Sequence, residues 1–327
     1  MIFKKAKTSA KPFVKKIRAA AELARLVTYD AMRFMRYSGV FRKGGHQPST
    51  AALITKQYHR IEKGLALAAP RPGFGEPGIK ELCELVSRSI KQGTSTNETT
   101  LAVDALAGYR DFNIGHGIQP KVWLVETLAL AASAGIHPNG LPTKRGTASW
   151  AASDGIAMIT SRASVRHYSD APVPDSVIES AISVAQHAPC VCNRQSGRIH
   201  LIRDPAIKAI ALSHQNGNRG FGESAPAVAI VTVDQSEMLE PAERYQHWID
   251  GGMFAQNFLL GLHVQGYGAC PLNWSASTAK DRAIRKALGF IDDAETIIMM
   301  VSIGVPAEGH SVARSERRPS SEVVTIA

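Results

Sequence analysis

The spacing of apolar residues divides the chain into a helical first part and a mixed second part. Near the N-terminus, apolar residues recur at alternating steps of four and three, which is the spacing of one face of an α-helix. They are Phe13, Ile17, Ala20, Ala24, Val27, Ala31 and Phe34. We therefore expect a long amphipathic helix at the start of the chain.

Helical spacing continues through the first 150 residues, interrupted by loops rich in glycine and proline. The segments with this spacing are 50–69, 79–92, 97–111 and 120–134, and the loops between them include 44–48 and 70–78. The alternation typical of half-buried strands is not evident in this part. Residues 135–150 contain several glycines and prolines, and we expect them to form a linker.

The pattern changes to mixed α and β from about Asp154. Short runs rich in β-branched residues predict strands at 198–203, 227–233 and 296–304, with a further candidate at 322–326. Helix start signals precede 175–187 and 206–214, and a long apolar helix follows Asp250. The sequence therefore predicts an all-helical region over 1–150 and an α+β domain over 151–327, with helices covering its sheet.

Charge is concentrated at the N-terminus. The 327-residue chain carries a net charge of +10, and residues 1–43 account for all of it, because they hold twelve Lys and Arg against Glu22 and Asp30. The first helix therefore has a basic face opposite its apolar stripe. Two interpretations stay open: the helix rests on an anionic membrane surface or acidic partner, or it packs on its own domain with a solvated basic face.

Several classes of protein are disfavoured by the sequence. Its longest apolar run is too short for a membrane span and the N-terminus lacks a signal peptide, so we expect a cytoplasmic protein. The cysteines, Cys83, Cys190, Cys192 and Cys270, are too few and irregularly spaced for a disulfide framework or zinc knuckle, so we expect reduced thiols and no structural metal. The basic segment lacks interleaved aromatics, which disfavours nucleic-acid binding.

Two segments carry candidate chemistry. Arg162, Ser164 and Arg166 offer two guanidinium groups and a hydroxyl; on a helix, Arg162 and Arg166 would share one face and bind an anion such as a phosphate. About two dozen residues later, Asn193 and Gln195 carry amides that both donate and accept, as the polar edge of a flavin or nucleobase requires. Together the two segments predict a mononucleotide cofactor site.

The order of four motifs resembles the FMN-dependent nitroreductase family. They are R-x-S-x-R-x-Y from Arg162, A-P-x-x-x-N-x-Q from Ala188, the helix after Asp250, and G-Y-G-A-C-P-L-N from Gly266. The resemblance covers roughly residues 151–327. It implies a nitroreductase-like sheet covered by helices on both faces, bound FMN, and a homodimer in which each cofactor pocket takes part of its wall from the partner.

The resemblance also implies roles for individual residues. Arg162 and Ser164 would hold the FMN phosphate, and Arg166 would lie at the N1/O2 edge of the ring, where a fixed positive charge stabilises the reduced flavin. A basic residue near the C-terminus, Arg317 or Arg318, would complete the phosphate site, and Ala163 stands where many relatives have a second arginine.

Two further segments are placed at the flavin by the same resemblance. Pro189, Cys190, Asn193 and Gln195 would line the ribityl chain and the pyrimidine edge. Cys270, Pro271, Leu272 and Asn273 would lie near N5, the atom that exchanges hydride, and the Pro-Leu-Asn triplet is most similar to the deiodinase and flavin-destructase branch. Cys270 has a second interpretation as a small buried residue, because a thiol is a weak donor.

We therefore expect an oxidoreductase that passes two electrons from a reductant, NADH or NADPH, to a small organic acceptor by a ping-pong mechanism. The chain has no Rossmann fingerprint, so a nicotinamide would bind only transiently over the flavin. The alternative is a non-catalytic dimeric scaffold that binds a membrane surface or an acidic partner through residues 1–43.

One more pair stands out in the helical region. His59 and Glu62 are three residues apart on a predicted helix, which is the spacing of metal and acid/base pairs but also of ordinary local contacts. We expect this helix and the following loop to cap the flavin and shape the substrate pocket.

Overall fold

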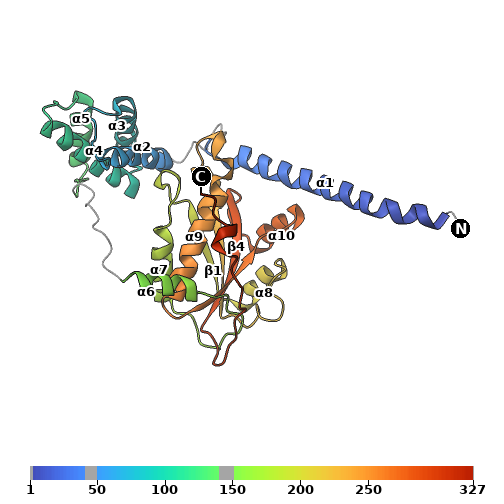
Figure 1. Cartoon of the computed structure of the whole chain (residues 1–327). Coiled ribbons are helices and arrows are strands. Elements are labelled where there is room, and N and C mark those ends of the chain that lie inside the picture. Colours follow the sequence, from blue (N-terminus) through green and yellow to red (C-terminus); the bar gives the residue numbers. More distant parts are fainter. Residues whose placement is uncertain (1–2, 41–49, 140–150, 327) are drawn as a thin grey trace.

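The computed structural model describes residues 3–40, 50–139 and 151–326, and of residues 3–13 the backbone alone. Three parts follow one another along the chain (Figure 1): the long helix α1, a helical module made of α2 to α5, and a mixed domain from α6 onward. The loop expected at 44–48 lies outside the described residues, as does most of the expected linker at 135–150.

The predicted N-terminal helix is confirmed as α1, Phe3–Tyr37. Its last turns pack on the mixed domain, where Phe34 is buried against Val233 and Met238. In the same stretch, Nη2 of Arg33 donates to the backbone carbonyl oxygens of Asp293 and Glu295 at 2.7 and 2.8 Å. The C-terminal end of α1 is therefore fixed to the mixed domain.

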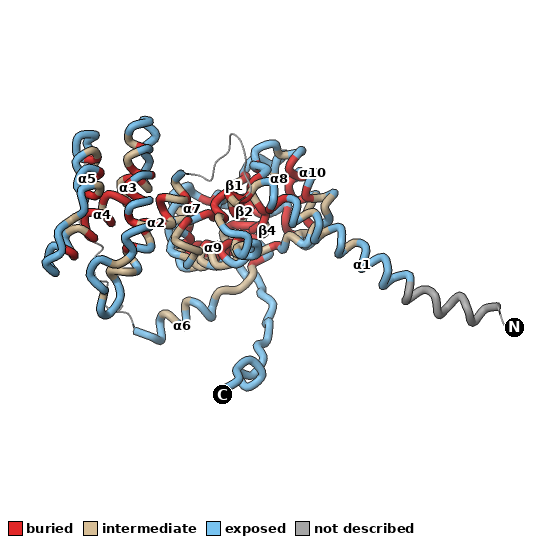
Figure 2. The backbone as a smooth tube through the Cα atoms, turned by 90° about the horizontal axis from the view of Figure 1, so that it is seen from above, coloured by how far each residue is buried: buried red, intermediate tan, exposed pale blue. Residues whose placement is uncertain are grey.

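The rest of α1 extends away from the body of the molecule (Figures 1 and 2). Ile17 and Val27 belong to the predicted apolar stripe, and they are 54% and 58% exposed. The interpretation that this helix packs on its own domain therefore holds only for the last turns of α1.

The helical module contains the four further helices expected in the first part of the chain. They are α2 (Thr50–Leu65), α3 (Glu76–Lys91), α4 (Asn97–Gly115) and α5 (Val122–Ser133). Each helix contributes buried apolar side chains to one core, including Ile54, Leu82, Leu106 and Leu124. This core is separate from those of the mixed domain, so the module has packing of its own.

Four antiparallel strands form the sheet of the mixed domain in the order β1-β2-β4-β3. They are β1 (Gly197–Ile202), β2 (Ala227–Asp234), β3 (Gly268–Asn273) and β4 (Glu295–Gly304). Three of them match the predicted strands to within about one residue. β3 was not predicted, because it contains Gly268 and Pro271; its place at the sheet edge tolerates proline, which cannot donate to a ladder.

Helices cover both faces of this sheet (Figure 1). The helices of the domain are α6 (Ala152–Ser161), α7 (Asp175–Gln186), α8 (Pro205–Ser213), α9 (Gln246–His263) and α10 (Thr278–Leu288). Side chains alternate along β2: Ala229 and Val231 pack with α7 and α9, whereas Val228 and Ile230 pack with α8 and α10. Apolar layers on both sides explain why this strand is a continuous apolar run.

The strand expected at 322–326 is wrong. The chain instead forms a short 3-10 turn over Ser320–Glu322, and residues 308–326 are all exposed (Figure 2). A strand needs a neighbour for its backbone groups, and this tail lies away from the sheet of its own chain. The apolar helix expected after Asp250 is confirmed as α9, which begins four residues earlier at Gln246.

The predicted fold class is confirmed: an α+β domain whose sheet has helices on both faces follows an all-helical region. Within the described parts of the chain, no helix combines the length and the apolarity that a membrane span requires.

Candidate functional site

Arg162, Ser164 and Arg166 do not lie on a helix, so that expectation is wrong. Helix α6 ends at Ser161, and the backbone of Arg162 is already extended. Ser164 then forms a parallel β-bridge with Ala269 of β3. In an extended segment, side chains alternate between two sides, so the three candidate residues still point to a common side while Val165, which is buried, points to the other.

The Arg162 side chain has an unsatisfied donor. Its Nη1 atom is buried and has no hydrogen-bond partner among the described residues. A hollow of about 260 Å³ adjoins this side chain and is lined also by Gly268 and His263. Burial, together with the Arg162 charge, lowers the pKa of His263, so this imidazole is neutral near pH 7. A buried guanidinium nitrogen without an acceptor fits an anionic ligand, since an unpaired buried donor is costly.

Cys270 lies close to Arg162, Ser164 and Arg166, although neither Arg166 nor Cys270 lines this hollow. The guanidinium of Arg166 is over the ring of Phe221, 5.8 Å from its centroid. Burial raises the pKa of the Cys270 thiol, although the nearby Arg166, Ser164 and Arg162 favour the thiolate. Cys270 thus belongs to the same cluster as the three candidate anion-binding residues, and it is also part of the apolar core.

The other residues of the β3 motif are divided between the core and the surface. Leu272 is buried, Pro271 is half-buried at the sheet edge, and Asn273 is exposed. The backbone carbonyl of Asn273 accepts a hydrogen bond of 2.8 Å from Nε2 of Gln215, and its Oδ1 accepts one of 3.4 Å from the backbone nitrogen of Ser275. The Nδ2 group is therefore the part of this residue available to a ligand.

The segment from Pro189 to Gln195 leads into β1 and has a strained backbone. Cys192, Asn193 and Gln195 have φ angles of 50°, 54° and 49°, in the left-handed region that L-residues rarely adopt. Such residues cost of order 1–3 kcal/mol each and cluster at functional sites. The turn holds the Cys190 thiol as an acceptor, at 3.3 Å from the backbone nitrogen of Gln195, and burial raises the pKa of this thiol.

Two buried interactions stabilise this strained turn. Arg194 makes a bidentate ion pair with Glu243, at 2.7 and 3.0 Å, and its side chain is fully buried. Asp250 of α9 accepts a hydrogen bond of 3.1 Å from the backbone nitrogen of Val191. The polar side chains of this segment are therefore held in fixed positions before any ligand binds.

Within one chain, the two candidate segments line different hollows. Ser164 pairs with β3, whereas Gly197 begins β1, and these strands lie at opposite edges of the sheet. Three strand spacings separate the two edges by roughly 14 Å. Asn193 and Gln195 line a large cavity that shares no lining residue with the hollow at Arg162.

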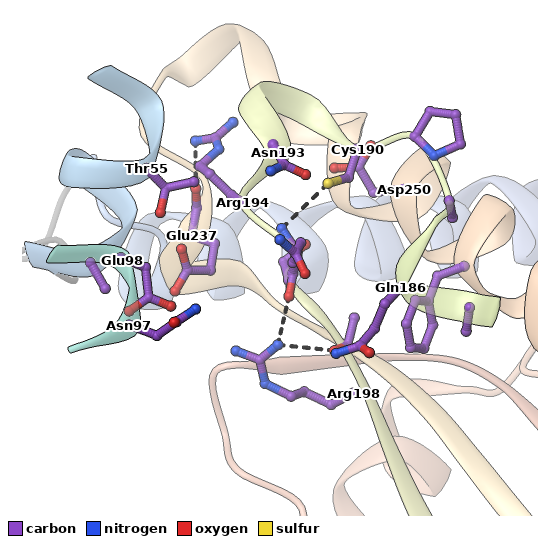
Figure 3. Close-up of a pocket in the computed structure, with 18 of the residues that line it drawn as sticks. Thr55, Asn97, Glu98, Gln186, Cys190, Asn193, Arg194, Arg198, Glu237 and Asp250 are labelled. Atoms are coloured by element: carbon purple, nitrogen blue, oxygen red, sulfur yellow. Dashed lines mark hydrogen bonds between the residues drawn. The ribbon is translucent and has the colours of Figure 1, made fainter. Parts of the chain in front are cut away.

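The larger cavity has a volume of about 670 Å³ and lies between the helical module and the mixed domain (Figure 3). The module supplies Ala51, Thr55, Tyr58, Asn97, Glu98 and Leu101. The mixed domain supplies residues of α7 and β1, the 188–196 segment, Glu237, Asp250 and Phe254. In Figure 3, Thr55, Asn97, Glu98 and Glu237 gather at one end of the cavity, and Gln186 and Cys190 lie at the other.

Glu237 is the most perturbed acid in this cavity. Burial and the nearby Asp234 raise its pKa to about 7, against the opposing effect of Arg198 and Arg194. Its carboxylate makes no hydrogen bond or ion pair with the described residues, and the residue is only 8% exposed. A carboxyl group that changes charge near pH 7 therefore faces the cavity.

The C-terminal tail carries Arg317 and Arg318, both exposed. Arg317 donates to the carbonyl oxygen of Ser315, and Arg318 lies 3.8 Å from a carboxylate oxygen of Glu322. Neither side chain lines the hollow at Arg162, although His310 of the same tail does. The structure of one chain thus leaves open which arginine completes an anion site.

His59 and Glu62 make a local contact, with 3.0 Å between Nδ1 and Oε2. Neither residue lines the large cavity. The face of α2 that reaches the cavity carries Thr55 and Tyr58 instead.

Sequence reasoning missed several functional candidates, among them Glu237, Glu98 and the Arg194–Glu243 pair. A signal existed for Arg194, which lies inside the motif between Asn193 and Gln195. No sequence signal marked Glu237 and Glu98, because they are far apart in the chain. Only the packing of the module on the mixed domain brings them to one cavity.

Comparison with known proteins agrees with these motifs. The model of the Nitroreductase family matches residues 159–213 and 208–305, which cover the sheet and the helices that pack on it. Residues 159–305 are therefore similar to the nitroreductase family, and this similarity covers the mixed domain alone. Residues 1–158, including the helical module, lie outside the match.

Three relatives illustrate the similarity. A protein of Streptomyces coelicolor, described as a candidate NADH dehydrogenase/NAD(P)H nitroreductase, is 27% identical over 179 residues, covering 48% of this chain and 88% of its own. A 4-nitrobenzoate reductase of Pseudomonas putida is 22% identical over 213 residues, covering 50% of this chain and 89% of its own. The structure of a candidate nitroreductase from Desulfovibrio desulfuricans in complex with FMN is 24% identical, covers 53% of this chain and 95% of its own, and has a TM-score of 0.46. The expectation that the chain is an oxidoreductase enzyme is confirmed at the level of the family.

Proposed function

We propose that the chain is an FMN-dependent oxidoreductase that works as a homodimer. The observation that carries this proposal is the buried Nη1 of Arg162, which has no acceptor among the described residues and adjoins a hollow. Ser164 and Arg166 do not line this hollow but follow Arg162 on the same extended segment. The similarity to the nitroreductase family makes FMN the ligand that fits this donor set. Arg162 and Ser164 would bind its phosphate, and Arg317 or Arg318 would add a further contact.

The remaining residues would orient the ring. Arg166 would face the N1/O2 edge, where a positive charge favours the reduced cofactor, and Cys270 and Asn273 stay the candidates nearest to N5. The flavin would supply a two-electron carrier, so that reductant and acceptor can use one site in turn, as ping-pong kinetics requires. NADH or NADPH is the proposed reductant, because a relative's description names both nicotinamides. The proposed acceptor is a small organic molecule.

The homodimer explains why the two candidate segments lie apart. A second copy, related by a two-fold axis at this face, would bring the β1 edge of one chain to the β3 edge of the other. Pro189, Cys190, Asn193 and Gln195 of the second copy would then line the flavin held by Arg162 of the first. Exposed surface suits such an interface: α6 has no buried residue, and Ile156 and Ile159 on it are 61% and 55% exposed.

An absorption spectrum of the purified protein from 300 to 550 nm, repeated without oxygen after adding NADH or NADPH, tests the proposal. Flavin bands that bleach with one nicotinamide support it and identify the reductant. A colourless protein that also fails to take up added FMN would contradict it.

We propose a second property for α1, contact with an anionic membrane surface. Its described side chains before the last turns include the exposed Ile17 and Val27 on the apolar stripe, together with Lys15, Lys16 and Arg18. An exposed apolar stripe beside basic residues is typical of helices that lie on anionic lipids. This contact would add to the enzyme activity and does not replace it.

A further inference from the structure

The acidic end of the large cavity contains a carboxylate without a partner. Glu237 is 92% buried, and among the described residues no group donates a hydrogen bond to it or pairs with it. Its side chain nevertheless points into the cavity beside Glu98 (Figure 3). A buried carboxyl group of this kind is destabilising unless it stays protonated or a ligand neutralises it.

The arginines at the cavity are engaged elsewhere. Both Nη atoms of Arg194 are bound by the carboxylate of Glu243, so this charge is neutralised locally. Nη1 of Arg198 donates to the backbone carbonyl oxygens of Gln195 and Gly197 at 2.8 and 2.9 Å. Arg198 keeps its positive charge, because carbonyl oxygens do not neutralise it. When Glu237 is ionised, the carboxylates of Glu98 and Glu237 still outnumber this one guanidinium, which favours a positively charged ligand group.

Glu98 comes from the helical module, on the opposite wall of the cavity. It lies in the first turn of α4, where Asn97 is the first helical residue and adds an amide oxygen as a second acceptor. Thr55 of α2 adds a hydroxyl group to the same end. Negative and neutral acceptors thus converge from two separately packed parts of the chain, as recognition of an N–H-rich cation requires.

The cavity also offers apolar surface. Ile182, Ile199 and Phe254 line it from the mixed domain, and Leu101 lines it from α4, one turn after Glu98. The volume of about 670 Å³ lies within the range of small-molecule sites. A ligand with a cationic head and a flat or apolar body would match both kinds of lining.

We propose that this cavity binds a small organic cation, with its ammonium or amidinium group between Glu98 and Glu237 and its apolar body toward Phe254 and Asn193. We propose further that this cation is the electron acceptor. That role rests on the proposed function, whereas the binding of the cation does not depend on it. The helical module, which the family match does not include, then selects the acceptor of this enzyme.

The raised pKa of Glu237 gives the proposal a second observable. A bound cation stabilises the charged carboxylate and lowers this pKa from about 7, so binding at pH 7 releases protons, about half a proton per site. Asp234 and Glu98 hold this pKa up and Arg198 and Arg194 oppose them, so these four groups set the size of the effect.

Isothermal titration of the full-length, oxidised protein without reductant tests the proposal. Three matched nitroaromatic probes are titrated: 4-nitrobenzylamine, which is an ammonium at pH 7, 4-nitrobenzyl alcohol, which is neutral, and 4-nitrobenzoate, which is an anion. We expect the ammonium to bind at least about 10-fold more tightly than the alcohol, and the anion to bind most weakly. Titrations in two buffers of different ionisation enthalpy should show proton release for the ammonium alone.

Matched variants locate the effect. Glu237→Gln and Glu98→Gln should each weaken ammonium binding about 10-fold and leave the alcohol unchanged, and Glu237→Gln should abolish proton release. Glu126→Gln on α5 removes an exposed glutamate of the same module outside the cavity and should change nothing. Equal binding of the three probes, tighter binding of the anion, or no detectable ammonium binding would overturn the proposal.

The flavin spectrum of the same sample separates this outcome from that of the proposed function. A protein that contains FMN and shows no charge preference overturns the cation site alone. A flavin-free protein that prefers the ammonium supports the cation site and contradicts the proposed function.

Discussion

Ser164 and Ala269 form a parallel β-bridge, and the backbone nitrogen of Val165 donates to the carbonyl oxygen of Ala269 at 3.1 Å. This pairing attaches the segment after α6 to the edge strand β3. It fixes Arg162 and Arg166 on one side of an extended backbone, next to Cys270. The candidate hydrogen-bond donors to an anion are therefore held at one edge of the sheet, whereas the Asn193 segment leads into the opposite edge.

Arg162→Ala should weaken FMN binding. The guanidinium supplies a charge-assisted contact of about 1.5–3 kcal/mol, so its loss should raise the Kd for FMN about 10- to 150-fold. Quenching of flavin fluorescence during titration of the flavin-free protein measures this Kd. Arg88→Ala, at an exposed position of α3 far from the hollow, is the control and should keep the wild-type value.

Arg194→Ala should destabilise the mixed domain. The substitution leaves Glu243 and the carbonyl of Glu237 without their buried partner, and breaking a buried ion pair costs about 3–5 kcal/mol. Urea unfolding measures the change. Arg314→Ala breaks an exposed pair with Glu316 and should cost less than about 1 kcal/mol; equal losses for the two variants would refute the role assigned to Arg194.

Glu237 should make stability fall with rising pH. Its pKa is raised to about 7 from an ordinary 4.5, so the folded state binds this proton more tightly than the unfolded state between these values. The contribution is fully present below pH 4.5 and is lost as pH rises through 7, by up to about 3 kcal/mol. Glu237→Gln should therefore stabilise the ligand-free protein at pH 8 and have little effect at pH 4.5, as measured by urea unfolding at both values. A variant with the same pH dependence as the wild type would show that this carboxyl group is not perturbed.

The motifs were predictable from sequence, but the geometry that unites them was not. Arg162, Ser164 and Arg166 are spaced by two residues, which places them together on a strand as well as suggesting a shared helix face. The contact of Val165, a β-branched residue, with Gly268 favours the extended conformation. This contact joins residues about a hundred positions apart, so the local sequence could not show it.

The limits of sequence reasoning have similar causes elsewhere. The continuous apolar runs of β2 and β4 were recognised, because both faces of these strands are buried, whereas Pro271 concealed the edge strand β3. Glu98 and Glu237 left no pattern, because each is an ordinary glutamate until the module packs on the mixed domain. The boundary between the two domains near residue 150 stays a prediction.

Membrane contact through α1 should depend on anionic lipid. The full-length protein should sediment with vesicles that contain phosphatidylglycerol and stay in the supernatant with phosphatidylcholine alone. Ile17→Asp combined with Val27→Asp places charges on the apolar stripe and should abolish sedimentation. Val125→Asp, on an exposed site of α5, is the matched control. Sedimentation that survives the double substitution would exclude the stripe as the contact.

The most direct test of the composite flavin site is a mixed dimer. One chain carries Arg162→Ala and the other carries Asn193→Ala with Gln195→Ala; the two are co-expressed with different tags and purified through both. If each flavin is held by Arg162 of one chain and Asn193 of the other, one of the two sites in the mixed dimer is intact. We then expect one FMN per mixed dimer, although neither variant binds FMN well as a homodimer. Flavin content no higher than in the two parent homodimers would contradict the account, because each site would then lie within a single chain.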